Sequence, residues 1–497
     1  MFPQASKRIW QFAKQFGVYT VLAAALCASP ARSEDTVEQR LDALQARLEQ
    51  VEADKKALAE RLESITAARE TAPDRTLADH GSQLHALQDS IREFREKAAA
   101  KKYPNITING VFQADSVWVH QDADSLNEFG RIEDGAGFRR ARLSARGSVT
   151  EHTNYFFQTD VGTAGVGRPT ITDVWVEEMD VPYLGNVRVG QWKQPFSLEV
   201  VSSFRYTTFF ERSSMFQAFT PFRRVGVGFY NHSNDLSMTW AASAFHSGQD
   251  QYGGTYTNDQ GYGTAERVTV LPYWESDGQQ YLHLGAGHFF NAPVNKTVNF
   301  RSLPEIFVGA QENGPVGSSG QAVPGALHGV PFFVATGNLS VNSYNVLGGE
   351  LLWVEGPLSI QSETMVTFVD QTGGNPVGVL AGTYAQIGYF LTGEHRPYDR
   401  KSGAIDRVIP HHNMKFCGDN GNGSGWGAWE VAARFSYLDL NSENIRGGTL
   451  TDYTLGVNWF LNPYLKVVFN WVHAMPDSPS FPKSQTDFFG MRTQVDF

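Results

Sequence analysis

Four arginines crowd one short segment, residues 138–147, whose sequence FRRARLSARG alternates like a β-strand. Side chains of a strand point alternately to its two faces, so Arg140, Arg142 and Arg146 share one face and the apolar residues between them share the other. Arg139 lies near the strand start. A guanidinium stays charged and offers a fixed fork of donors that matches phosphate or carboxylate oxygens. Such a row along the wall of a pore predicts a path for anions.

More cations follow along the chain and belong to the same set of candidate anion-binding residues. The full set is Arg139, Arg140, Arg142, Arg146, Arg188, Lys193, Arg205, Arg212, Arg223 and Arg224. The alternative is that the arginines of a wide pore pair with acidic residues across it. The acidic residues available for such pairing are Asp115, Asp160, Asp173, Glu177, Glu199 and Glu211. The residues alone leave both interpretations open.

The strands that must carry these cations are predicted by strict alternation, which is clearest at the C-terminus. Residues 489, 491, 493, 495 and 497 form a mostly apolar face that ends in Phe497, and the residues between them are Gly, Arg, Gln and Asp. An apolar face backed by a polar one suits a barrel strand between lipid and an aqueous lumen. The terminal aromatic resembles the recognition signal of outer-membrane barrels, which predicts the barrel-assembly machinery as a partner.

The whole C-terminal part, residues 103–497, is predicted to be an all-β transmembrane barrel with lipid as its outer solvent. Its length suits about 16 antiparallel strands, with 14 or 18 as alternatives, around an aqueous channel. A tight turn at Leu461-Asn462-Pro463 is expected on the periplasmic side. Polar stretches that suit extracellular loops cover residues 120–137, 247–263, 291–339 and 394–427.

The first 33 residues read as a signal peptide. Lys7, Arg8 and Lys14 precede an apolar core at residues 18–28, and small residues precede a cleavage site before Glu34. Its removal leaves 37 basic against 52 acidic residues, a balance that argues against nucleic acid as a partner. It also leaves one cysteine, which excludes an internal disulfide.

Residues 34–102 differ in composition and are predicted to form an α-helical coiled-coil stalk in the periplasm. Heptad positions a and d fall at residues 41, 48, 55 and 62 and at residues 37, 44, 51, 58 and 65, almost all of them Leu, Val or Ile. The repeat favours self-association over a single amphipathic helix that lies on its own domain. A stalk of this kind could contact the cell wall.

Other constellations carry little chemistry. His411, His412 and Cys417 could bind a metal, but they lie in a Gly-rich loop without a fourth ligand at fixed spacing. No serine motif points to the strand histidines, so a hydrolase triad is not indicated. The sequence therefore predicts no enzyme, no metal and no cofactor.

Four segments in order resemble successive blocks of the phosphate-selective porins, the O and P type. They are FRRARL at 138–143, GQWKQPF at 190–196, FERS at 210–213 and FRRVGV at 222–227. The resemblance implies a 16-stranded trimeric barrel with an inward loop at residues 196–222 that includes Arg205 and Arg212. It would place Arg139 and Arg140 near the narrow zone, with Lys193 as a weaker candidate. The acidic net charge and the stalk depart from the family pattern.

Together these observations predict an outer-membrane porin for passive diffusion of small anions, with phosphate or polyphosphate as the leading substrates, through an arginine-lined constriction. The alternative is a general or structural porin whose stalk tethers the outer membrane to the cell wall or another envelope layer. A homotrimer is expected, with the stalk contributing to its assembly.

Overall fold

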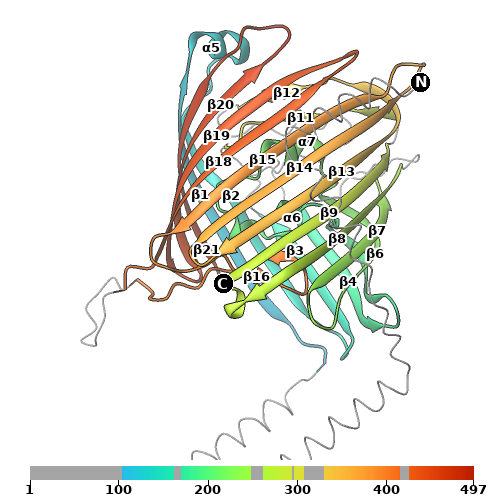
Figure 1. The fold of residues 1–497 in the computed structure, drawn as a ribbon, viewed down its shortest axis with the longest axis vertical. Coiled ribbons are helices and arrows are strands. Elements are labelled where there is room, and N and C mark those ends of the chain that lie inside the picture. Colours follow the sequence, from blue (N-terminus) through green and yellow to red (C-terminus); the bar gives the residue numbers. More distant parts are fainter. Residues whose placement is uncertain (1–102, 162–169, 248–260, 294–295, 307–329, 415–424) are drawn as a thin grey trace, which may run out of the picture. The chain divides into compact units, whose positions relative to one another are not determined.

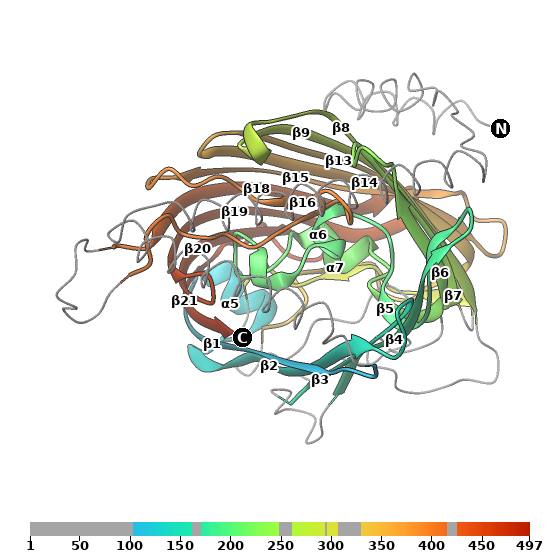
Figure 2. The same ribbon diagram turned by 90° about the horizontal axis from the view of Figure 1, so that it is seen from below.

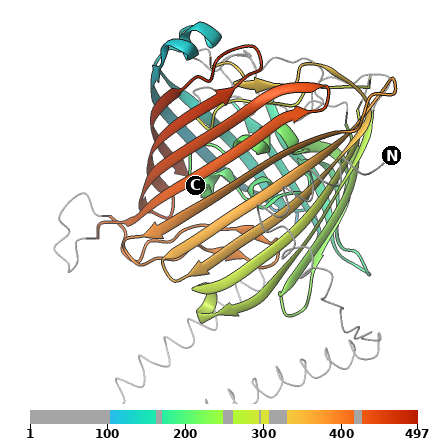
Figure 3. The same ribbon diagram turned by 45° about the horizontal axis from the view of Figure 1, so that its top comes forward.

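The structure is a computed structural model that describes residues 103–161, 170–247, 261–293, 296–306, 330–414 and 425–497. The predicted leader and the predicted stalk lie outside the described residues. Within the described part, sixteen long strands pair antiparallel with their neighbours and close into a barrel (Figures 1 and 3). This confirms the predicted barrel and its strand number.

The barrel closes at the seam where the first and last strands meet. Strand β1 (Thr107–Gln121) pairs with β2 (Gly135–Ser148) on one side and with β21 (Thr486–Asp496) on the other. The remaining wall strands follow in chain order: β3 (Thr153–Asp160), β4 (Thr170–Val181), β5 (Gly185–Lys193), β6 (Arg223–His232), β7 (Met238–His246), β8 (Tyr262–Glu275), β9 (Gln280–Ala292), β13 (Leu339–Glu355), β14 (Leu358–Gln371), β15 (Gly378–Phe390), β18 (Ala428–Ser442), β19 (Ile445–Asn462) and β20 (Leu465–Asp477).

The strands separate an apolar outer wall from a polar inner one, as the alternation predicts. On β21, Phe489 and Met491 are 51% and 39% exposed, whereas Arg492 and Gln494 are each 2% exposed. Apolar residues on the outside and polar residues on the inside are what a barrel in lipid requires. Among the described residues, the search for a helix that could span a membrane finds none.

The connections differ between the two ends of the barrel. Short turns lie at the end that also holds the C-terminus, which we call the turn end. The turn after Asn462 lies there, as predicted. Longer connections lie at the other end, the loop end. The first of them carries the helix α5 (Ala123–Phe129).

The segment 391–427, described at residues 391–414 and 425–427, contradicts the expectation for the stretch that begins at residue 394, because its described parts lie at the turn end. It leaves β15 beside the turn between β13 and β14, where the amide of Phe390 donates to the carbonyl of Pro357 at 3.0 Å. The prediction was wrong because length and polarity were taken as marks of an extracellular loop. The described part of this segment instead folds back into the barrel through two short strands, β16 (Tyr398–Asp399) and β17 (Ala404–Ile405).

The connection between β5 and β6, residues 194–222, lies inside the barrel, and we call it the inward loop. It carries the helices α6 (Leu198–Val201) and α7 (Ser214–Phe219) and the 3-10 turn η1 (Phe204–Tyr206). Figure 2 shows α6 and α7 within the ring of strands. This is the region where the family resemblance implied an inward loop.

Glycines of the inner wall make room for the side chains of the inward loop. A Cβ at Gly382 would lie 2.6 Å from Met215, and one at Gly490 would lie 2.8 Å from the ring of Phe210. Such distances leave no space for any larger residue. The loop can therefore lie flat against the wall formed by β9 to β21, and Met215 and Phe210 are buried there.

Carboxylates from elsewhere in the chain hold the start of both helices of this loop. Glu363 of β14 accepts the amides of Leu198 and Glu199, each at 2.9 Å, and Glu305 accepts the amide of Ser214 at 3.0 Å. The first amides of a helix have no partner within it, so these contacts satisfy them and fix the position of the loop.

Candidate functional site

A β-bulge turns two successive arginines into the lumen. Between β1 and β2, Arg140 pairs with Gln113 and Phe138 pairs with Ala114, so Arg139 is the extra residue. A bulge re-aims a side chain in this way. Phe138 is 58% exposed on the outer wall, while Arg139 and Arg140 are each 1% exposed. Alternation alone cannot predict this placement, because the bulge breaks the period of two.

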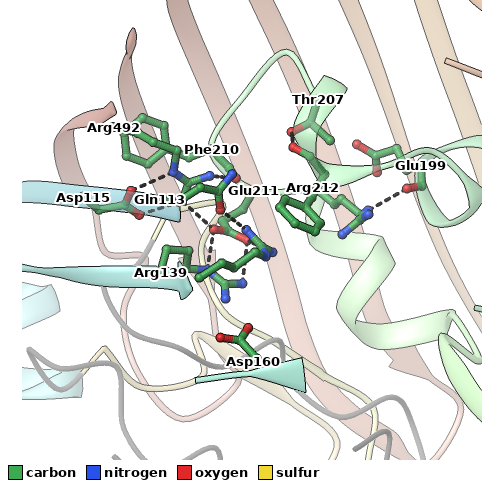
Figure 4. Close-up of polar contacts among 12 residues, drawn as sticks. Gln113, Asp115, Arg139, Asp160, Glu199, Thr207, Phe210, Glu211, Arg212 and Arg492 are labelled. Carbon is green, nitrogen blue, oxygen red and sulfur yellow. Dashed lines mark hydrogen bonds and ion pairs between the residues drawn. The ribbon is translucent and has the colours of Figure 1, made fainter. Parts of the chain in front are cut away.

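Both arginines approach Glu211 of the inward loop, and Figure 4 shows Arg139 beside this carboxylate. Arg139 donates to its two oxygens at 2.7 and 2.9 Å, and the Arg140 guanidinium lies 3.8 Å away. Arg492 reaches the same carboxylate at 3.1 Å and also binds Asp115 at 2.6 Å. Burial raises the pKa of Glu211, but the arginines outweigh it and lower the pKa to about 2. Glu211 is therefore an ionised anchor shared by three cations.

The other acidic candidates also contact arginines, but Arg142 and Arg188 contact the neighbouring strand and not the opposite side of the pore. The remaining contacts are Arg142 with Asp160 at 2.7 Å, Arg188 with Glu177 at 2.7 Å, Arg223 with Asp173 at 2.9 Å and Arg434 with Glu199 at 3.5 Å. Much of the predicted positive charge is thus balanced within the barrel.

The ten candidate cations differ in how far they reach open space. Those that are 5% exposed or less are Arg139, Arg140, Arg142, Arg212, Arg223 and Arg224. The side chains of Arg188 and Arg205 are each 19% exposed, Lys193 is half-buried and Arg146 is exposed. The amine of Lys193 donates to the carbonyl of Ser202 at 2.8 Å, and Arg212 donates to the carbonyl of Glu199 at 2.6 Å. The assignment of these ten residues to anion binding stays a prediction.

A cavity of about 310 Å³ lies between the inward loop and the wall from β3 to β8. Six cations and one carboxylate, Asp173, belong to its lining. Two of the cations, Arg267 and Lys401, are absent from the sequence prediction. Arg267 was missed because it stands alone in its strand, and Lys401 because its segment was assigned to the wrong end. The cationic lining residues are Arg188, Lys193, Arg205, Arg223, Arg267 and Lys401.

A second cavity of about 1170 Å³ opens at the turn end of the barrel. Arg146, Arg205 and Arg407 line it together with Asp496. Arg205 lines both cavities, so its side chain borders each of them.

The metal candidate receives no support within the described residues. Three or more His, Cys, Asp or Glu side chains do not come together there in an arrangement that could hold an ion. Cys417 lies outside the described residues, so the predicted set with His411 and His412 is described only in part.

The match to known proteins covers the barrel. Residues 112–497 match the family described as phosphate-selective porin O and P. The chain belongs to this family. The protein is therefore a porin of the outer membrane, a channel and not an enzyme. In such barrels the short turns face the periplasm, so the turn end is the periplasmic end.

Individual relatives of this porin are distant. Porin O of Pseudomonas aeruginosa is 24% identical over 427 residues, which cover 81% of this chain and 90% of the relative. An uncharacterized protein of Caulobacter vibrioides is 25% identical over 68% of this chain and 62% of its own length. The solved anion-selective porin from Comamonas acidovorans is 11% identical, covers 79% of this chain and 99% of its own, and has a TM-score of 0.48.

Proposed function

We propose that this porin lets small anions, phosphate in particular, diffuse passively through the lumen past the 310 Å³ cavity. The observation that carries the proposal is the lining of that cavity, where six cations face one carboxylate. Its volume holds about ten waters at about 30 Å³ each, which suits a small hydrated anion. The description of the family supports phosphate as the substrate class.

Each cation of this cavity attracts a passing anion only weakly, and several of them act together. Arg188, Arg223 and Arg267 each have a carboxylate partner, at 2.7, 2.9 and 2.7 Å. A cation that already has a counter-charge attracts a passing anion less than a lone one does. Weak binding at several sites suits conduction, because an ion must leave each site as readily as it enters.

The proposal also includes assembly. We propose a homotrimer, which the family resemblance implied, and recognition of Phe497 by the barrel-assembly machinery. The tether alternative depends on residues 34–102, which lie outside the described residues, and the described barrel contains no observation that favours it.

The test measures reversal potentials in a KCl gradient and the block of chloride current by phosphate. The wild-type pore should be anion-selective, and phosphate should reduce its chloride current. Replacing both lysines of the cavity, Lys193→Gln with Lys401→Gln, should shift the reversal potential toward cations and weaken the block. Lys483→Gln is the matched control, because the Lys483 side chain is 79% exposed and lies in the connection between β20 and β21.

A cation-selective wild-type pore whose chloride current ignores phosphate would refute the proposal. A double variant that behaves like Lys483→Gln would show that this cavity does not contribute to anion selectivity or to phosphate block.

A further inference from the structure

The cavity of about 1170 Å³ is bordered by an ion bridge built from three distant parts of the chain. Asp496, the last residue of β21, lies between Arg205 of the inward loop and Arg407 of the segment 391–427. Its carboxylate is 3.7 Å from Nε of Arg205 and contacts Nη2 of Arg407 directly. All three residues line the cavity of about 1170 Å³, which we call the periplasmic cavity. Arg205 also lines the cavity of about 310 Å³, which we call the inner cavity.

The two arginines of this bridge are held in place by groups other than Asp496. Arg407 donates to the carbonyl of Pro463, and its guanidinium lies 4.7 Å from the ring centroid of Tyr464. The guanidinium of Arg205 lies 5.4 Å from the ring centroid of Phe204, and its backbone carbonyl accepts from the Gln494 amide at 3.1 Å. Loss of the carboxylate would therefore leave both guanidinium groups near their present positions.

The arginines also remain reachable from the lumen. The side chain of Arg205 is 19% exposed and that of Arg407 is 23% exposed, whereas that of Asp496 is only 4% exposed. Arg146, which is exposed, adds a third cation to the same cavity. A small oxyanion in the periplasmic cavity can thus approach both guanidinium groups.

We propose that Arg205 and Arg407 form a second anion site at the periplasmic exit, and that the Asp496 carboxylate competes with the anion for it. The proposal rests on the proposed function and extends it to the exit step. Carboxylate and phosphate oxygens fit the guanidinium fork in the same way. Asp496 fills the site when it is empty, yields to a phosphate-like oxyanion that arrives from the inner cavity, and then helps to displace that oxyanion toward the periplasm.

This competition predicts that removal of the carboxylate charge strengthens phosphate binding. Asp496→Asn removes the competitor, so the two arginines should hold phosphate more tightly. The phosphate concentration that halves the chloride current should fall by about threefold or more, the scale of a partly exposed ion pair, and the reversal potential should shift toward anions. Arg407→Gln should do the opposite, because it removes half of the site.

Asp180→Asn is the matched control. The Asp180 side chain is 82% exposed near the end of β4, at the same end of the barrel and outside both cavities. Its replacement should leave phosphate block and selectivity at wild-type values. Folding of each variant is checked by its heat-modifiable mobility.

The outcomes separate this inference from the proposed function. A wild-type pore that is neither anion-selective nor blocked by phosphate refutes the proposed function itself. A wild-type pore that behaves as proposed, with Asp496→Asn indistinguishable from Asp180→Asn, overturns the exit site alone. If Asp496→Asn fails to fold, Arg407→Gln decides, because an unchanged half-blocking concentration in that variant also overturns the exit site.

Discussion

At the scale of single residues, one carboxylate of the inward loop contacts several arginines of the barrel wall. Glu211 contacts Arg139 and Arg492 directly and has Arg140 nearby. Breaking a buried pair by removing one partner costs about 3–5 kcal/mol, because the other charge stays buried. The family resemblance gave Arg139 and Arg140 a place near the narrow zone, and in the structure they also anchor the inward loop through Glu211.

The first residue-scale prediction is that Glu211→Gln loosens the inward loop. Three arginines lose their common counter-charge, so they repel one another and the loop should move away from the seam. Single-channel conductance should rise and become noisier, and the variant should unfold at a lower temperature. Conductance and thermal stability equal to wild type would show that Glu211 does not hold the loop.

The pH dependence of stability follows from the same carboxylate. The pKa of Glu211 is about 2 in the folded barrel and lies near its usual 4.5 in the unfolded chain. Its stabilisation, of order 3 kcal/mol, is thus complete above pH 4.5 and is lost as the pH falls from 4.5 through 2. The folded fraction measured between pH 2 and 5 should decline less steeply in Glu211→Gln than in wild type, and an identical slope would contradict the assignment.

At the scale of elements, the inward loop depends on small residues in the opposite wall. Gly382→Val should push Met215 and α7 away from β15, because a Cβ at this position already comes within 2.6 Å of Met215. Overpacking of this kind costs about 1–3 kcal/mol. The variant should show altered conductance and lower thermal stability.

The matched control for Gly382→Val is Ala385→Val on the same strand. Ala385 is exposed on the outer wall, where lipid accommodates a larger apolar side chain. Equal effects of the two changes would show that the fit between loop and wall does not matter.

The sequence predicts elements well where one hydrophobic period repeats. It predicts them poorly where contacts between distant segments determine the course of the chain. Alternation along β18 to β21 is enough to predict barrel strands, because one face of each strand contacts lipid and the other faces the aqueous lumen. The bulge at Arg139 interrupts that period and leaves no local signal. The inward course of the segment 391–427 depends on partners such as Ser202, whose hydroxyl accepts the amide of Ile405 at 3.1 Å, and a linear pattern does not contain them. The stalk and its oligomeric state stay predictions.

At the scale of the whole molecule, the barrel is closed where its first and last strands meet. Gly110 and Phe497 exchange backbone hydrogen bonds of 3.0 and 3.1 Å. A Cβ at Gly110 would lie 2.4 Å from the Phe497 ring, so only glycine lets the terminal ring lie across β1. The aromatic that the sequence suggested as a recognition signal also covers the seam.

Two changes separate these roles of Phe497. Deleting Phe497 should lower the amount of folded barrel recovered from membranes, because both the signal and the seam contact are lost. Gly110→Val keeps the signal but blocks the contact, so it should lower heat resistance of the folded barrel more than membrane recovery. Phe489→Ala, on the outer face of the same strand, is the control for loss of an exposed aromatic. Unchanged recovery after the deletion would contradict the recognition role.

The bridge at the exit has a consequence for biogenesis. Asp496 follows Arg205 and Arg407 in the chain and belongs to β21, which pairs with β1, so its position beside them depends on this pairing. Arg492, which shares Glu211 with Arg139, lies on the same strand. A barrel in which β1 and β21 are not paired would therefore lack both sets of contacts. Under the proposed function, a defect in this closure would also be a defect in anion selectivity.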